Sequence, residues 1–141
     1  VDNPSLTART PEGTLATLQP HAVVVGHRDI PQDSEVRNHP GGFQQIASHE
    51  PERVLEQLFA AGFRSVYLEG GKTLMSAFVQ ADLVDEYHIT MGPMLLGGKY
   101  LAVDDIGVDT MSQAKALTLS SVETLGHGLW VVATPTRVEE K

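Results

Sequence analysis

The sequence predicts an α/β protein: a mixed, mostly parallel sheet flanked by helices and followed by a C-terminal antiparallel hairpin. Residues 22–25 form a continuous β-branched run, which is typical of a strand buried on both faces in a parallel sheet. Two segments, near 51–61 and 73–82, carry apolar residues at helical spacing. Residues 117–122 and 129–133 are strand-like and are separated by a glycine turn, which indicates the hairpin.

The first half of the chain alternates between loops and short regular elements. Residues 1–20 contain three prolines and no periodicity, so we expect a loop before the first strand at 22–25. Residues 27–42 are polar and rich in proline and glycine, and residues 43–47 could form a second short strand. Pro51 suits the first position of a helix, and Gly62 suits its end.

The segment 65–77 predicts a strand, a tight glycine turn and a helix. Residues 66–68 are a short apolar run, which we expect to be a central strand, and Glu69 would stand at its carboxyl end. Gly70 and Gly71 let the backbone approach a ligand closely. The helix that follows offers free N–H groups to a phosphate, and Lys72 adds a cation. The residues alone leave open the alternative that the two glycines merely turn the chain.

The same segment contains Gly-Gly-Lys-Thr, which looks like the end of an ATPase P-loop. A P-loop needs a further glycine at position 66, and Val66 occupies it inside the expected strand. The spacing therefore excludes that motif.

The second half of the chain carries strand signals of a different kind. In residues 85–91, Tyr87, Ile89 and Met91 alternate with polar residues, which predicts a half-buried strand. Residues 93–98 are typical of an apolar loop, and residues 99–114 give no clear signal. The hairpin closes the chain, and we expect it to form part of a homodimer interface, since it exposes an apolar edge and contains Trp130.

Composition excludes several classes of function. A chain of 141 residues fits a single domain spanning 1–141, and its net charge of −8 gives no basic footprint for nucleic acid. There is no cysteine, and the six histidines are scattered, so we expect no metal site. No apolar run is long enough to span a membrane, and we expect no membrane partner and a cytoplasmic location.

Three segments together resemble the riboflavin-biosynthesis pyrimidine reductases. Residues 1–9 (Val-Asp-Asn-Pro-Ser-Leu-Thr-Ala-Arg) resemble the family's Asp-Asp/Asn-Pro-x-Leu-Thr-x-Arg loop, and residues 68–74 resemble its Glu-Gly-Gly-x-Thr-Leu turn. Residues 83–86 and 93–98 resemble its Leu-Val-Asp-Glu and Pro-x-Leu-Leu-Gly-Gly segments. This family has a dihydrofolate-reductase-like fold and usually forms the C-terminal half of a bifunctional deaminase–reductase.

The resemblance implies an NADPH-dependent reduction in which the ribose of a phosphoribosylaminopyrimidine becomes a ribityl chain. It implies substrate contacts for Leu6, Arg9 and Glu69, and it assigns no catalytic residue. Asp2 would lie near the cofactor, and the loop with His27 and Arg28 would meet its 2′-phosphate. The cofactor phosphates would be wrapped by Gly70, Gly71, Lys72, Thr73, Leu74, Met75, Ser76 and Ala77. Without the resemblance, Asp2 is a turn residue and Arg9 a solvated charge.

The chain departs from the family at its beginning. The family's first strand, first helix and leading glycine-rich segment would precede Val1, so we expect the chain to be incomplete and inactive by itself. Two alternatives remain open at this point. One is a related enzyme of the same fold that reduces another heterocycle, such as a dihydrofolate-like substrate. The other is a non-catalytic dimerisation or regulatory module.

Overall fold

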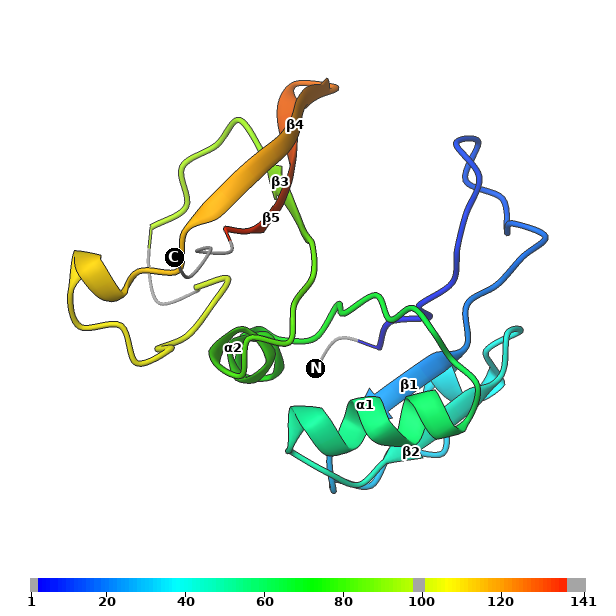
Figure 1. The fold of residues 1–141 in the computed structure, drawn as a ribbon. Helices are drawn as coiled ribbons and strands as arrows, with labels where there is room; N and C mark the ends of the chain where they lie inside the picture. Colours follow the sequence, from blue (N-terminus) through cyan, green and yellow to red (C-terminus); the bar gives the residue numbers. More distant parts are fainter. Residues whose placement is uncertain (1–2, 98–100, 137–141) are drawn as a thin grey trace. The chain divides into compact units, whose positions relative to one another are not determined.

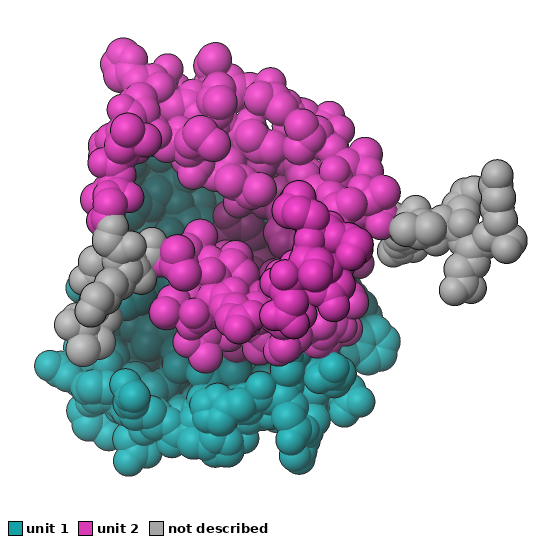
Figure 2. All heavy atoms as spheres, turned by 90° about the vertical axis from the view of Figure 1, so that its left-hand side faces the viewer, with its two compact units in different colours: residues 1–64 teal, residues 65–141 magenta. Residues whose placement is uncertain are grey.

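The computed structural model describes residues 3–97 and 101–136. The chain forms two compact units, residues 1–64 and residues 65–141 (Figures 1 and 2). Each unit has its own sheet and one α-helix. In the described residues, no helix has the length and apolar character needed to cross a membrane.

Unit 1 is built on two parallel strands, β1 (Ala22–Val25) and β2 (Phe43–Ile46). Ala22 lies opposite Phe43 and Val25 lies opposite Ile46, so the two carboxyl ends finish at the same edge of the sheet. The crossover between them contains the short 3₁₀ helix η1 (Glu35–Asn38). The buried apolar side chains of this unit are Ala22, Val36, Ile46, Val54 and Leu58.

Helix α1 (Pro51–Ala60) follows β2 and confirms the predicted helix. Pro51 stands at its start, where a missing N–H costs nothing. Val54 and Leu58, one turn apart, are buried, which is the apolar stripe expected of an amphipathic helix. Gly62 has a φ of 95° and ends the helix, since its N–H donates to the carbonyl of Phe59 in a conformation that favours glycine.

Unit 2 contains helix α2 (Lys72–Gln80) and a three-stranded antiparallel sheet. The strands are β3 (Tyr87–Met91), β4 (Leu117–Leu125) and β5 (Gly128–Pro135), in the order β3-β5-β4. A second 3₁₀ helix, η2 (Met111–Gln113), precedes β4. The predicted hairpin is therefore confirmed as β4 and β5, with β4 at one edge of the sheet (Figure 1).

The expected central strand at 66–68 is wrong, because these residues lie outside any strand in the structure. Tyr67 is 71% exposed and Val66 is also exposed, so the run is not buried. An apolar run that contains valine and tyrosine favours extended backbone, but a strand also needs a neighbour to accept and donate its backbone hydrogen bonds. No described strand pairs with these residues, and the parallel pairing is confined to β1 and β2.

The sheet of unit 2 exposes an unusual amount of apolar surface. Strand β3 was expected to be half-buried, yet only Tyr87 is partly covered, and Ile89 and Met91 are exposed. The edge strand β4 exposes apolar side chains as well, with Leu119 at 62%. The exposed large apolar residues of the sheet are Ile89, Met91, Leu117, Leu119, Val122, Leu125 and Leu129.

Candidate functional site

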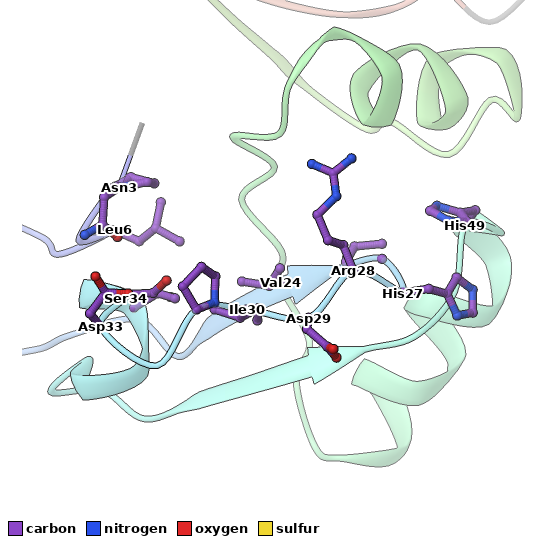
Figure 3. A pocket seen from close by; sticks show the side chains of 15 residues that line it. Asn3, Leu6, Val24, His27, Arg28, Asp29, Ile30, Asp33, Ser34 and His49 are labelled. Carbon is purple, nitrogen blue, oxygen red and sulfur yellow. The ribbon is translucent and has the colours of Figure 1, made fainter. Parts of the chain in front are cut away.

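A cavity of about 720 Å³ lies in unit 1 beside the carboxyl ends of the parallel strands (Figure 3). Open parallel sheets place ligands at this edge, because the loops that follow neighbouring strands meet there. The cavity is lined by residues of the N-terminal segment (Asn3, Pro4, Leu6), by residues 24–31, by Asp33, Ser34 and Val36, and by His49.

The loop after β1 is fixed by hydrogen bonds to β2. Gly26 has a φ of 135°, a conformation that side-chain-bearing residues rarely adopt, and its N–H donates to the carbonyl of Ile46 at 2.9 Å. The amide of Gln45 donates to the carbonyls of both Gly26 and Arg28, each at 2.9 Å. The backbone that carries Arg28 is therefore held in place from the neighbouring strand.

Three basic side chains line this edge of the cavity. His27 follows β1 and His49 follows β2, and their ring centroids are 4.9 Å apart. Arg28 is exposed, and no ion pair of its guanidinium occurs within the described residues. The side chains of Arg28 and Asp29 point in opposite directions (Figure 3). This arrangement can hold an anion.

The N-terminal segment brings Leu6 to the cavity and leaves Arg9 away from its lining. Leu6 has a φ of 54°, and its carbonyl lies 3.0 Å from Nε2 of His39. Arg9 pairs with Leu15 in a short antiparallel bridge, and its guanidinium donates to the carbonyl of Gly13 at 2.8 Å. Asp2, the remaining candidate of this segment, lies outside the described residues.

In unit 2, the Gly70–Gly71 turn leads directly into α2. A Cβ atom on Gly70 would lie 2.7 Å from Cδ2 of Leu74, which packs over this position, whereas a Cβ on Gly71 would meet nothing within 4 Å. Gly71 is the N-cap residue and has no side chain to cap the helix. Its carbonyl accepts the N–H groups of Leu74 and Met75, and the described residues offer no backbone acceptor to the N–H groups of Lys72 and Thr73. The start of α2 therefore presents free donors.

Asp104 contacts the first two turns of α2 through its side chain and its backbone. Nζ of Lys72 lies 3.1 Å from Oδ2 of Asp104, and the N–H of Asp104 donates to Oγ of the buried Ser76 at 2.6 Å. Lys72 is thus already paired with a carboxylate. Glu69 and Thr73 are exposed, and Leu74, Met75 and Ala77 are half-buried.

Several residues of the two candidate regions were not predicted from the sequence. His49 could have been found by the rule that ligands lie at the carboxyl ends of parallel strands, because it follows the second strand of the parallel pair. Gln45 and His39 carried no such signal, since their roles depend on contacts across the fold. In the part of the chain that the structure describes, no three His, Asp or Glu side chains come together as metal ligands would.

Comparisons with known proteins agree on one family. The family model described as "RibD C-terminal domain" matches residues 1–131. The chain is 43% identical over 128 residues to riboflavin biosynthesis protein RibD from Mycobacterium tuberculosis, covering 91% of this chain and 37% of that protein. It is 39% identical over 80 residues to 2,5-diamino-6-ribosylamino-4(3H)-pyrimidinone 5′-phosphate reductase from Methanothermobacter thermautotrophicus, covering 55% of this chain and 37% of that protein.

The solved structures show the same fold. Acinetobacter baumannii RibD, form 2, superposes with a TM-score of 0.81 at 24% sequence identity, over 96% of this chain and 44% of that chain. This likeness confirms the α/β class and the dihydrofolate-reductase-like fold expected from the sequence. The chain spans about 37% of the length of the curated relatives described above.

Proposed function

The chain belongs to the RibD C-terminal domain family, and from this premise we propose that the full-length protein is an NADPH-dependent oxidoreductase of riboflavin biosynthesis. It reduces the ribose of a phosphoribosylaminopyrimidine, 5-amino-6-(5-phosphoribosylamino)uracil, by adding a hydride at the C1 carbon of the sugar. Residues 1–141 contribute to one reductase domain, and the cytoplasm is the proposed location.

The observation that carries this proposal is the cavity of unit 1. Its basic edge, formed by His27, Arg28 and His49, suits a dianionic phosphate in an otherwise acidic chain. We assign this edge to the 2′-phosphate that distinguishes NADPH from NADH. The carboxylates of Asp29 and Asp33 also line the cavity, and they oppose the binding of an anion. Because the guanidinium of Arg28 is always charged, we assign the choice of cofactor to this residue.

The proposed role of the unit 2 segment is to hold the cofactor's other phosphates. Free N–H groups and the positive end of the helix dipole favour an anion at the start of α2. Gly71 leaves space for close approach of the phosphate, since even an added Cβ atom would meet nothing within 4 Å there. Lys72 would then exchange its contact with Asp104 for one with the phosphate. Residues 70–77 as a whole are assigned to this role.

The proposed substrate contacts are Leu6, Arg9 and Glu69, with Asp2 near the cofactor. Leu6 lines the cavity, which supports its assignment. Arg9 is exposed, and within the described residues its guanidinium donates only to the Gly13 carbonyl, so a substrate phosphate could recruit it by a stronger, charge-assisted bond. Glu69 is exposed at the turn before α2.

The test is an assay of the full-length protein with NADPH and two substrates. These are the phosphoribosylaminouracil and the diamino compound named for the Methanothermobacter relative. We expect NADPH to be consumed with the uracil and the product to gain two hydrogens by mass spectrometry. Turnover with only the diamino compound would show that the diamino compound is the substrate and that the uracil is not. No turnover with either compound would refute the proposal and favour an enzyme acting on another heterocycle or a non-catalytic module.

We also propose that the full-length protein is a homodimer that buries the sheet of unit 2. The edge strand β4 and its neighbours expose a row of apolar side chains. An exposed apolar surface of this kind, at the edge of a sheet, is typical of a protein–protein interface. Leu119→Glu places a charge in that row and is expected to shift the protein to a monomer in light scattering, whereas Glu123→Gln is the matched control on the same strand. A wild-type monomer at micromolar concentration would contradict the proposal.

A further inference from the structure

We propose that His39 is a positioning residue that holds Leu6 in the wall of the unit 1 cavity, so that affinity for the pyrimidine substrate depends on the His39 ring. The inference rests on the proposed function in one respect, namely that Leu6 contacts the substrate. The geometry that points to it is independent of that function.

Leu6 has an unusual backbone conformation. Its φ of 54° lies in the left-handed region, where a residue with a Cβ atom is disfavoured unless its surroundings hold it there. The side chain lines the cavity, and the carbonyl faces Nε2 of His39 at 3.0 Å. The contact with His39 can therefore determine how the side chain of Leu6 is placed in the cavity wall.

The His39 ring is fixed by both of its nitrogens. The N–H of Gly41 donates to Nδ1 at 3.1 Å, and the carbonyl of Leu6 lies 3.0 Å from Nε2. Because a backbone N–H can only donate and a carbonyl can only accept, Nδ1 carries no proton and Nε2 carries one. The two contacts together fix the tautomer and the orientation of the ring, and the residue is only 6% exposed.

The turn that carries His39 is closely packed. A Cβ atom on Gly41 would lie 1.9 Å from the carbonyl oxygen of Pro20, so the backbones of Gly41 and Pro20 are in contact. The N–H of Gly42 donates to the carbonyl of His39 at 3.0 Å. The turn that carries His39 is therefore rigid, and it fixes the position of Nε2, which contacts the carbonyl of Leu6.

The segment around Leu6 is anchored separately on both sides. The side chain of Asn3 accepts the N–H of Glu35 at 3.1 Å. The backbone of Ala8 exchanges two hydrogen bonds with the amide of Gln19, at 3.0 and 2.9 Å. Loss of the His39 ring is therefore expected to release the conformation of Leu6 without detaching the whole segment.

The test compares His39→Leu with His39→Gln in the full-length protein. Leucine fills the space and has no donor, whereas the glutamine amide can donate to Leu6 and accept from Gly41. We expect His39→Leu to raise the KM for the pyrimidine about tenfold, as befits one lost buried hydrogen bond, and to change the KM for NADPH less than twofold. His39→Gln is expected to restore most of the substrate affinity.

Two further measurements separate positioning from a general structural role. In a Leu6→Gly background, which lacks the contacting side chain and accepts a positive φ freely, His39→Leu is expected to have little further effect on KM. By NMR, the backbone coupling and carbon shifts of Leu6 are expected to report a positive φ in the wild type and to change in His39→Leu.

The outcomes distinguish this proposal from the proposed function. A Leu6 conformation that is unchanged in His39→Leu would overturn the positioning role, whatever the activity. Equal increases in KM for NADPH and substrate, or an undiminished effect in the Leu6→Gly background, would overturn it too. An inactive wild-type protein with the expected change at Leu6 would refute the reductase assignment, and with it the stated link to substrate affinity, while leaving the contact itself established.

Discussion

Replacing Arg28 by alanine is expected to weaken NADPH binding to the full-length protein more than tenfold and to leave NADH binding nearly unchanged. The guanidinium lies at the edge of the cavity and is unpaired within the described residues, so it can meet a phosphate without losing an existing ion pair. A hydrogen bond to a charged group contributes about 1.5–3 kcal/mol, which corresponds to a factor of about 10 or more in affinity. Titrations of both cofactors against wild type and variant measure the difference.

The neighbouring Asp29 provides the control. Its side chain points away from that of Arg28, so Asp29→Asn removes a charge at the next position without removing the expected contact (Figure 3). The ratio of NADPH to NADH affinity is expected to change much less in Asp29→Asn than in Arg28→Ala. Equal losses for the two cofactors in Arg28→Ala would show that Arg28 does not recognise the 2′-phosphate.

Replacing Gly41 by alanine is expected to be the most damaging small substitution in unit 1. The added Cβ would lie 1.9 Å from the carbonyl oxygen and 2.8 Å from the carbonyl carbon of Pro20. These are backbone atoms, so the clash cannot be relieved by rotating a side chain, and the destabilisation should reach about 3 kcal/mol. Amide hydrogen exchange in β1 and β2 is expected to accelerate about 100-fold, since tenfold corresponds to about 1.4 kcal/mol.

Gly97→Ala is the matched control, because a Cβ at Gly97 would meet nothing within 4 Å. Its effect on stability is expected to stay within about 0.5 kcal/mol, as for most surface substitutions. Unchanged exchange rates in β1 and β2 of Gly41→Ala would mean that the turn carrying His39 is not rigid.

The parts of the fold that were predicted correctly depend on local signals. The amphipathic stripe of α1, the proline at its start and the glycine after its end lie within a dozen residues, and the hairpin of β4 and β5 is closed by an adjacent turn. Residues 66–68 carried an equally clear local preference for a strand. They do not form one because strand pairing depends on residues distant in sequence.

The candidate site shows the same limit. The family resemblance assigned the loop with His27 and Arg28 to the cofactor, and these residues line a cavity at the carboxyl ends of the parallel strands, where such sheets place ligands. The same sequence could not show that the Arg9 head contacts the Gly13 carbonyl, or that His39 supports Leu6. The hydrogen-bond partner of a charged or aromatic side chain is set by the residues that the fold brings near it. Such contacts produce no periodic pattern in the sequence.

The pairing of Lys72 with Asp104 would affect how dissolved ions take part in the proposed binding of a cofactor phosphate. An unpaired lysine near a helix N-terminus attracts anions from the solution, and a phosphate that binds there releases them. The affinity for the phosphate then falls steeply as the salt concentration rises. Here a carboxylate of the same chain already neutralises the cation at 3.1 Å. The phosphate would displace a tethered group instead of a dissolved one, and Asp104 would take up a cation from solution when it is displaced. Binding at this turn would therefore be less sensitive to ionic strength than the charge of Lys72 alone suggests.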